Sequence, residues 1–355
     1  MGNNGAGRQI EVVPLGDSGW DIIRKLCDDR YLVQTNYLYG LIDGHGTVIA
    51  EPQWDVDFNY LTYKEGLFSV KKNGKYGYIN FDGEPVIPVQ WDEADNFSEG
   101  LAGVKSNDPL EIDVSEYGAF SEIWDEERGL PKEFMPFGPS GKWGFINEGG
   151  EIVLPFQWDG VRYFCDGLAK VELNEKQEFI NREGKVVIPI RWDEADNFSE
   201  GLAAVKLNGK WGFINKEGEV VVSFQWDAAG NFNEGLARVK SDEKYGFINK
   251  EGKGIIPFQW DEALRFSEGL AGVKLDGKWG FINKEGKVVI PLQWGNVLNF
   301  SEGLAAVASG GKWGFIDKDG EIVLPVEWDH ICMFEFKQGE TVAVKNGSRY
   351  MIRIR

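Results

Sequence analysis

The side chains that most often carry chemistry, histidine and cysteine, are few in this chain and lie far apart. The two histidines are His45, in the glycine-rich stretch IDGHGTV, and His330, directly after a Trp-Asp pair. Neither has a Ser or Cys nearby in a recognisable nucleophile motif. The three cysteines, Cys27, Cys165 and Cys332, are an odd number without C-x-x-C spacing, so they predict neither a disulfide framework nor a zinc site. We therefore predict no catalytic residue and no enzymatic activity.

Carboxylates are the remaining candidates, and aspartate recurs after tryptophan throughout the chain. The recurring residues are Asp55, Asp92, Asp159, Asp193, Asp227, Asp261 and Asp329. Their surroundings lack the D-x-D-x-D-G loop and downstream Glu of an EF-hand, and only the segment DKDGE at 317–321 resembles part of one. Aspartate in this position is typical of a turn or cap. We predict no metal and no cofactor.

The chain is strongly acidic, with 57 Asp and Glu against 38 Lys and Arg and a net charge of −19. Nucleic acids and anionic membranes bind clustered Lys and Arg, so this balance argues against both and, among partners, favours a basic one. The simpler interpretation, which we prefer, is that the charge keeps a tryptophan-rich array from associating with itself. Residues 1–10 lack the regions of an ordinary secretory signal, and no apolar run reaches membrane-spanning length. We predict a flexible tail at 1–10 and a cytoplasmic protein, with export by a non-classical route as the alternative.

Tryptophan recurs at regular intervals. One set consists of Trp54, Trp91, Trp158, Trp192, Trp226, Trp260, Trp294 and Trp328, with a spacing of 34 residues from Trp158 onward. Trp20 and Trp124 fit the same spacing and bring this set, the ruler tryptophans, to ten. A second set, Trp143, Trp211, Trp279 and Trp313, lies 19 residues after a ruler Trp and precedes Gly. This period predicts a single array over 11–355 with about ten units, of which those around Trp20 and Trp124 have decayed. The decayed unit at 106–140 is either a protruding docking loop or a drifted unit that still packs.

The local signals within a unit are those of β-structure. Short β-branched or aromatic runs such as WGFIN and KVVIP are joined by KEG, where Gly suits a tight hairpin turn. A third run, LAAVKL, follows SEG and turns through NGK into the next Trp-Gly. Each unit therefore reads as a three-stranded meander, and the glycines and prolines argue against helical repeats.

The skeleton K-W-G-F-I-N-K-E-G-x-x-V-I-P resembles the bacterial Trp-Gly repeat family, usually called WG repeats. The resemblance covers the chain from about Trp20 to Arg349, and several copies match over most of their length. It implies a β-rich repeat protein without an established common activity, for which a binding or scaffolding role is the usual expectation.

The ends of the chain bear on whether the array is open or closed. EVVP at 11–14 matches the second strand of a unit, and RYMIRIR at 349–355 matches the first, so the two ends could complete one shared unit. Three strands per unit, however, are fewer than the four of a usual propeller blade, and ten units would make a large ring. We predict an open, curved solenoid or superhelix, with a closed propeller-like ring as the alternative.

The recurrent tryptophans allow a structural and a functional interpretation. As structural residues, they would stack unit on unit into a continuous core. The positions with this predicted role are Trp54, Trp91, Trp143, Trp158, Trp192, Trp211, Trp226, Trp260, Trp279, Trp294, Trp313 and Trp328. As functional residues, they would be stacking platforms of a carbohydrate or cell-wall binding module. We favour the structural interpretation, because residues that every unit needs are normally part of the core.

Positions that differ between units are better candidates for binding. The four residues after Trp-Asp vary, and a variable loop at one fixed position would form a row along one face of the array. The candidate interaction residues are Arg162, Tyr163, Arg265 and His330 in these loops and Tyr117, Phe120, Trp124 and Phe134 in the segment 106–140. We therefore predict a non-enzymatic scaffold that binds another protein, with the carbohydrate module as the alternative.

Overall fold

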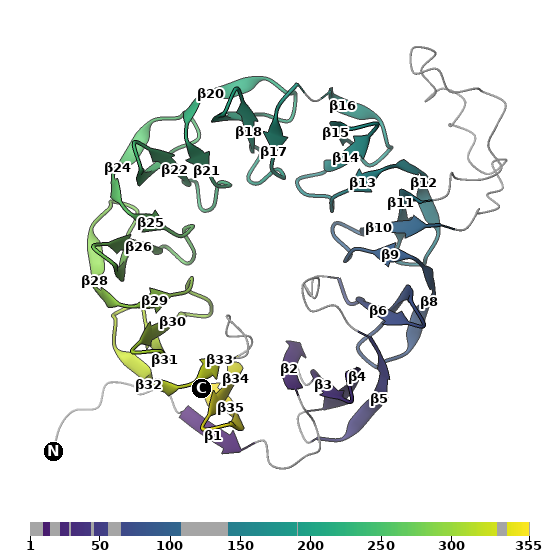
Figure 1. Cartoon of the computed structure of the whole chain (residues 1–355), viewed down its shortest axis with the longest axis horizontal. Helices are drawn as coiled ribbons and strands as arrows, with labels where there is room; N and C mark the ends of the chain where they lie inside the picture. Colours follow the sequence, from purple (N-terminus) through teal and green to yellow (C-terminus); the bar gives the residue numbers. More distant parts are fainter. Residues whose placement is uncertain are drawn as a thin grey trace. The chain divides into compact units, whose positions relative to one another are not determined.

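Every regular element in the described part of the chain is a β-strand (Figure 1). The computed structural model describes residues 10–14, 22–27, 30–43, 46–55, 65–107, 141–189, 191–331 and 339–354. The prediction of an all-β protein is confirmed. Within the same residues, no helix is long and apolar enough to cross a membrane.

The sheet β25–β28 shows how one unit folds. Its strands are β25 (Glu262–Ala263), β26 (Ala271–Leu275), β27 (Lys278–Ile282) and β28 (Val288–Trp294), antiparallel and adjacent in chain order. The turn after β27 contains Gly286 at φ +77°, a conformation that Gly adopts without steric cost. A ruler Trp, Trp294, ends the outer strand. The unit thus has the three predicted strands and an additional strand of two residues, too short to leave a periodic signal in the sequence.

The described residues form nine sheets, eight with four strands and one with three. Contacts divide the chain into two compact units, the first comprising Met1–Val48, Trp192–Asn215 and Glu219–Arg355, and the second Ile49–Arg191 and Lys216–Gly218. Besides β25–β28, the first unit contains β1 (Ile10–Pro14), β2 (Ile22–Cys27), β3 (Arg30–Thr35), β4 (Leu38–Asp43), β17 (Glu194–Ala195), β18 (Ala203–Leu207), β19 (Lys210–Ile214), β20 (Val220–Trp226), β21 (Ala228–Ala229), β22 (Ala237–Ser241), β23 (Lys244–Ile248), β24 (Gly254–Trp260), β29 (Asn296–Val297), β30 (Leu304–Ser309), β31 (Lys312–Asp317), β32 (Ile322–Trp328), β33 (His330–Ile331), β34 (Glu340–Lys345) and β35 (Ser348–Ile354). The strand β5 (Val48–Trp54) begins at the boundary, and the second unit continues with β6 (Phe68–Lys72), β7 (Lys75–Ile79), β8 (Pro85–Trp91), β9 (Glu93–Ala94), β10 (Leu101–Ser106), β11 (Lys142–Asn147), β12 (Ile152–Trp158), β13 (Gly160–Val161), β14 (Ala169–Leu173), β15 (Lys176–Ile180) and β16 (Val186–Pro189).

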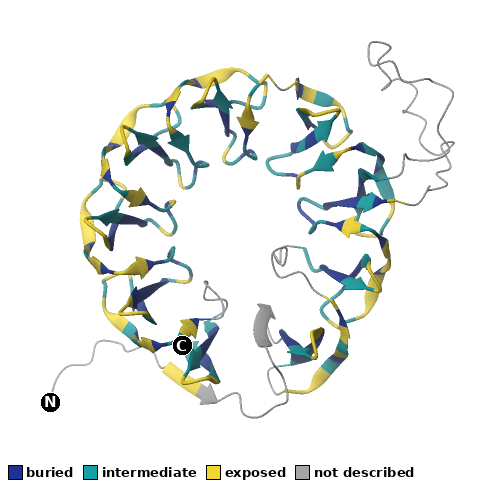
Figure 2. Ribbon diagram, in the orientation of Figure 1, coloured by how far each residue is buried: buried dark blue, intermediate teal, exposed yellow. Residues whose placement is uncertain are grey.

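Both faces of the middle strands are buried, because consecutive sheets within each unit pack face to face. In β18 the successive residues Ala203, Ala204 and Val205 are all buried, whereas a sheet with one wet face would alternate. One core cluster joins Leu236, Phe247, Ile256 and Trp260 of one sheet to Ala263, Phe266, Ala271, Val273 and Ile282 of the next. Figure 2 shows the same division in each sheet, with buried middle strands and a largely exposed fourth strand. No sheet has a core of its own.

The two ends of the chain meet in one sheet. The strand β1 pairs with β35 from Ile10 opposite Ile354 to Pro14 opposite Tyr350, in the order β1-β35-β34-β33. The next sheet along, which contains β3 and β4, packs on this one through a cluster of Tyr31, Val33, Ile42, Val342 and Met351. The fold is therefore a β-propeller with nine blades, closed by its own ends. Our preference for an open solenoid was wrong, since eight of the nine described sheets have the four strands of a propeller blade, and the alternative of a closed propeller is confirmed.

The number of blades differs by one from the number of ruler tryptophans. The strands β10 and β11 are direct neighbours, with Ser106 opposite Lys142, so the chain leaves and re-enters one sheet between them. Gly141 N–H donates to the Ser106 carbonyl at 2.8 Å. Residues 108–140, and with them Trp124 and most of the unit predicted at 106–140, lie outside the described residues, as does the tail at 1–9.

We expect the closing strand to contribute measurably to stability. Removal of residues 1–14 deletes β1 and leaves one edge of β35 unpaired, which should lower the thermal midpoint by about 5–10 °C. The matched control removes residues 1–9 only and keeps β1. Equal midpoints for the two truncated chains, measured by calorimetry, would show that β1 does not close the propeller.

Candidate interaction site

The turn between the first two strands of a blade has an unusual backbone. In β25–β28 it runs from Ser267 to Leu270, and its two central residues, Glu268 and Gly269, have φ values of +54° and +87°. Such a two-residue turn normally carries Asn-Gly, because Glu is disfavoured at positive φ. The same Glu-Gly pair with positive φ recurs at Glu99, Glu200, Glu234 and Glu302. A strained residue repeated in this way is expected to have a compensating contact.

That contact is a hydrogen bond to the next blade. The Glu268 carboxylate accepts from Gly303 N–H at 2.9 Å, and Glu234 accepts from Gly269 N–H at 3.0 Å. The second unit has the same bond between Glu99 and Gly167 at 3.0 Å. Serine of the turn adds a second link, since the Ser267 hydroxyl donates to the carbonyl of Phe300 at 2.7 Å. We call this pair of contacts the turn latch.

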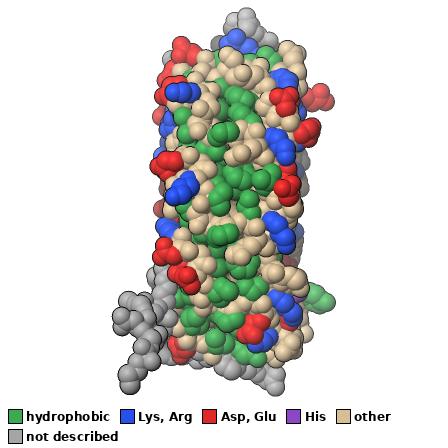
Figure 3. Space-filling model, turned by 90° about the vertical axis from the view of Figure 1, so that its left-hand side faces the viewer, with side chains coloured by type: hydrophobic (Ala, Val, Ile, Leu, Met, Phe, Trp, Pro, Cys, Tyr) green, Lys and Arg blue, Asp and Glu red, His purple; other side chains and the backbone are tan. Residues whose placement is uncertain are grey.

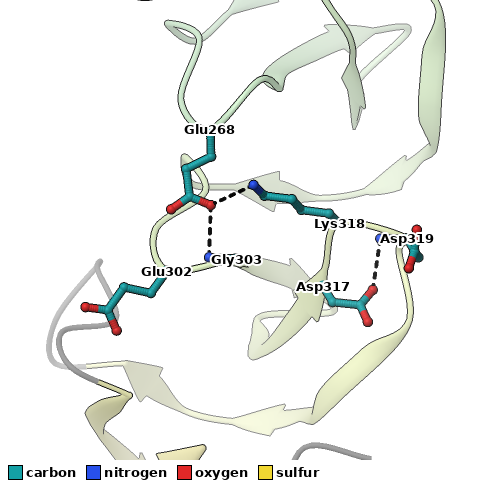
Figure 4. Close-up of a pocket in the computed structure, with 6 residues that line it drawn as sticks. All are labelled: Glu268, Glu302, Gly303, Asp317, Lys318 and Asp319. Carbon is teal, nitrogen blue, oxygen red and sulfur yellow. Dashed lines mark hydrogen bonds and ion pairs between the residues drawn. The ribbon is translucent and has the colours of Figure 1, made fainter. Parts of the chain in front are cut away.

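A cleft of about 450 Å³ lies at one turn latch, between the sheets β25–β28 and β29–β32 (Figure 4). It is lined by Glu268, Glu302, Gly303, Asp317, Lys318 and Asp319. Lys318 Nζ lies 3.1 Å from a carboxylate oxygen of Glu268. Partial burial raises the pKa of Glu268, but the hydrogen bonds from Lys318 and Gly303 outweigh it and lower that pKa below its usual value. Glu302 in turn accepts from Gly339 N–H at 2.7 Å.

Two further carboxylates make this cleft acidic. Figure 4 shows Asp317 and Asp319 beside each other, at the end of Lys318 opposite to Glu268. Asp317 Oδ1 accepts from the backbone N–H groups of Asp319 and Glu321 at 3.0 and 2.9 Å. The single cation of the cleft is already engaged by Glu268. The arrangement can therefore attract a positively charged group from outside the chain.

This turn differs from its equivalents in combining Asp317 with a Glu four residues later, since Asp43, the Asp at the same position of the first described turn, is followed there by Thr47. The corresponding residue is Asn in six other described turns, namely Asn80, Asn147, Asn181, Asn215, Asn249 and Asn283. In three of them the amide donates to a Glu four residues later, for example from Asn215 to Glu219 at 2.9 Å. Asp317 keeps a Glu at that position, Glu321, but has no amide to donate. The segment DKDGE was the sequence signal for this cleft. Within the described residues, no group of three or more His, Cys, Asp or Glu side chains could hold a metal ion.

The aspartates after the ruler tryptophans have a structural role. Asp159 accepts hydrogen bonds from Lys142 of the preceding blade and from Asn174 N–H of its own blade, the latter at 2.8 Å. Lys244 and Asp276 N–H approach Asp261 in the same way, at 2.5 and 2.9 Å. Each carboxylate therefore ties two successive hairpin turns together. The hydrogen bonds from lysine lower the pKa values of Asp159 and Asp261 below the usual range.

The predicted interaction residues do not meet in the cleft. Arg162 and Tyr163 follow β13, Arg265 follows β25, and all three side chains are exposed, Tyr163 by 44%. His330 is also exposed but lies in β33, opposite Val344. In the blades that begin with β9, β13, β17, β21 and β25, likewise, the first two of the four variable residues after Trp-Asp form a short strand, and only the next two lie in a loop. Tyr117, Phe120, Trp124 and Phe134 lie outside the described residues, as do His45 and Cys332, whereas Cys27 ends β2 opposite Arg30.

The recurrent tryptophans lie in or beside the core. The ruler residues Trp54, Trp91, Trp158, Trp226, Trp260, Trp294 and Trp328 are buried, and Trp192 is half-buried. Of the second set, Trp279 is buried, and Trp143, Trp211 and Trp313 are half-buried. Lys206 lies over the ring of Trp211 and Lys274 over that of Trp279, 5.7 and 5.8 Å from the ring centroids. Buried or lysine-covered rings offer little open surface for a flat ligand.

The sequence pattern of the WG containing repeat matches eight stretches of the chain, at 39–76, 76–108, 143–176, 179–211, 211–245, 245–279, 279–313 and 313–350. The chain belongs to the WG repeat family. Repeats such as 211–245, 245–279 and 279–313 run from one aromatic residue before Gly to the next. Such a repeat joins the third strand of one blade to the first strands of the next. No curated protein sequence matches this WG repeat protein.

Among solved structures, a crystal structure of a eukaryotic initiation factor is similar, with 12% identity, a TM-score of 0.59 and coverage of 92% of this chain and 93% of that chain. The dihydro-haem d1 dehydrogenase NirN shares 14% identity over 90% and 78% of the two chains, with a TM-score of 0.44. The C-terminal WD40 domain of Sif2 shares 10% identity over 84% and 94%, with a TM-score of 0.41. At these identities, the first likeness shows the fold alone.

The lysine–aspartate ties predict a loss of stability in acid. Because the folded pKa values lie below the unfolded value of 3.8, the ties stabilise the fold fully above that pH and are lost as the pH falls through the folded pKa values. The variant Gly295→Asp would add a tie beside Lys278, where the sequence has Gly. We expect it to raise stability by about 0.5 kcal/mol at pH 7 and by nothing near pH 2. A pH-independent gain in urea unfolding would contradict this account.

Replacement of Asp317 by Asn should stabilise the turn, although it removes one negative charge from the cleft. Asp317→Asn would supply the amide donor to Glu321 and remove a like-charge contact, so we expect stabilisation by about 1 kcal/mol. The converse variant, Asn215→Asp, recreates the Asp–Glu arrangement beside Glu219 and should destabilise by a similar amount. Chemical denaturation of both variants tests the pair, and shifts of the same sign in the two would refute it.

Proposed function

We propose that this WG repeat protein is a non-enzymatic scaffold that binds another protein through basic side chains of that partner. The observation that carries the proposal is the acidic cleft, where Asp317 and Asp319 stand beside a lysine already engaged by Glu268. The net charge of −19 would add a long-range attraction for a basic partner. The repeat propeller supports the proposal, because its rigid blades hold such side chains at fixed positions.

Exposed residues outside the cleft are further candidates for contact, each within its own unit. Tyr163 carries a large and partly apolar side chain of the kind that contributes most to interfaces, and Arg162 is exposed next to it. Arg265 and His330 are exposed in the other unit. We regard a carbohydrate ligand as less favoured, because the tryptophans that would stack on sugars are buried or covered by lysine. The lack of enzymatic activity, a cytoplasmic location and a bacterial source remain predictions from the sequence.

A display selection tests the proposal. The intact chain would be immobilised and used to select binders from random twelve-residue peptides at low salt. We expect the selected peptides to be rich in Lys and Arg. Their affinity should fall about tenfold for the double variant Asp317→Asn, Asp319→Asn, since two charges in a partly enclosed cleft contribute about 1.4 kcal/mol or more.

The control is a matched charge removal in another blade. Asp82 occupies the position of Asp319 in the turn before β8, so Asp82→Asn removes a charge from an equivalent site without touching the cleft. It should leave the affinity unchanged. Selection of uncharged peptides, or equal losses in the cleft variant and in Asp82→Asn, would show that the cleft is not the contact point.

A further inference from the structure

The outer strand of each blade is an open sheet edge, and the protein protects almost all of these edges with proline. Among the described strands, the fourth strand is last in its sheet, so one side of its backbone has no partner among them. Proline interrupts such an edge because it has no N–H and its ring obstructs an approaching strand. Among the described outer strands, prolines occur in β1, β5, β8, β12, β16, β24, β28 and β32, at Pro14, Pro52, Pro88, Pro155, Pro189, Pro257, Pro291 and Pro325.

The strand β20 is the exception. Its sequence is VVVSFQW, and Ser223 stands where β24, β28 and β32 have Pro257, Pro291 and Pro325. The burial pattern is the same as in β24 and β28, so the substitution leaves the strand in its usual place. The other edge of β20 is paired with β19, from Ile214 opposite Val220 to Trp211 opposite Trp226. At this position β20 therefore keeps an N–H that β24, β28 and β32 lack.

The side chains of β20 also suit an added strand. Val220 and Val221 are exposed by 47% and 41%, and the strand contains no charged residue. Exposed Ile255, Val288, Val289 and Ile322 occupy matching positions in β24, β28 and β32, and Figure 3 shows hydrophobic side chains gathered in a band along the face that these strands form. An uncharged, β-branched edge without proline is what natural sheets normally avoid.

Carboxylates flank this edge at both ends. Glu219 precedes Val220, and Asp227 follows Trp226, with side-chain exposure of 43% for Asp227. Lys210 already pairs with Asp227 at 2.6 Å. The end of the strand that carries the larger net negative charge is therefore the preceding one, at Glu219. A second copy of this chain would bring the same carboxylates and a net charge of −19 against them, which disfavours self-pairing. The charge pattern favours a foreign strand with basic ends.

We propose that β20 is a docking edge for an extended segment of another protein, one with alternating β-branched residues and lysine or arginine at its ends. The segment would add a fifth strand to the sheet β17–β20 by backbone hydrogen bonds, and its basic ends would lie near Glu219 and Asp227. This mode of recognition uses an exposed edge for affinity and side-chain pattern for specificity. It is separate from the acidic cleft and does not rest on the function proposed for it.

Hydrogen exchange of the intact chain with a model strand tests this site. The probe is the peptide Lys-Val-Thr-Val-Thr-Val-Lys at millimolar concentration. Its control is the same peptide N-methylated at every residue, which cannot donate backbone hydrogen bonds. We expect the unmodified peptide to slow exchange of the amides at 220–224 about tenfold and the methylated peptide to leave it unchanged. Absence of protection, or equal protection by both peptides, would overturn the proposal.

A proline variant tests whether the missing proline is what makes the edge of β20 available. Ser223→Pro installs the residue that the neighbouring blades already tolerate, so the fold should persist, and protection by the peptide should disappear. In that background Pro257→Ser opens the edge of β24, and protection should move to 254–258.

The cleft variant Asp317→Asn, Asp319→Asn should leave protection at β20 intact, which separates this proposal from the proposed function. A wild-type dimer that Ser223→Pro dissolves, seen by sedimentation, would instead show that a second copy occupies the edge and would also overturn the proposal.

Discussion

The structure depends on one constraint: a blade cannot bury its own faces. The middle strands have apolar residues on both sides, as Ala203, Ala204 and Val205 show, so each sheet needs a neighbour on either face. Within each unit consecutive sheets supply this cover for one another. At the chain ends the cover comes from closure, since the last sheet takes β1 as its outer strand and packs on the sheet of β3 and β4. The repeated sequence is the means of producing equivalent faces.

Polar groups hold the blades in register once the faces are packed. The turn latch uses Glu at positive φ, an unfavourable choice for the turn alone, because the carboxylate reaches the next blade's Gly N–H. The aspartates after the ruler tryptophans tie adjacent hairpins through lysine. Much of the acidic composition therefore has structural partners. The cleft at Asp317 and Asp319 is of interest because these two carboxylates add negative charge beyond the carboxylates that link one blade to the next.

The all-β fold and the repeat could be predicted because glycine turns and a fixed tryptophan spacing are local signals. The two-residue first strand, such as Glu262–Ala263, could not, because it is too short for a periodic pattern. That omission left three strands per unit and led to the wrong choice of an open array. The pairing of Ser106 with Lys142 is non-local, and the spacing of Trp124 gave no sign of it. DKDGE was visible in the sequence, but its neighbour Glu268 in the cleft comes from another blade and required the structure.

Closure by β1 has a consequence for biosynthesis. Ile10 and its partner Ile354 lie far apart in the sequence, so β1 is synthesised long before β35. At typical translation rates β1 waits roughly 20–70 s before β35 exists. During this interval the earlier blades can stack on one another, but the first and last faces stay open to water and to other nascent chains. The synthesis of β35 therefore sets the earliest time at which these two faces can be covered.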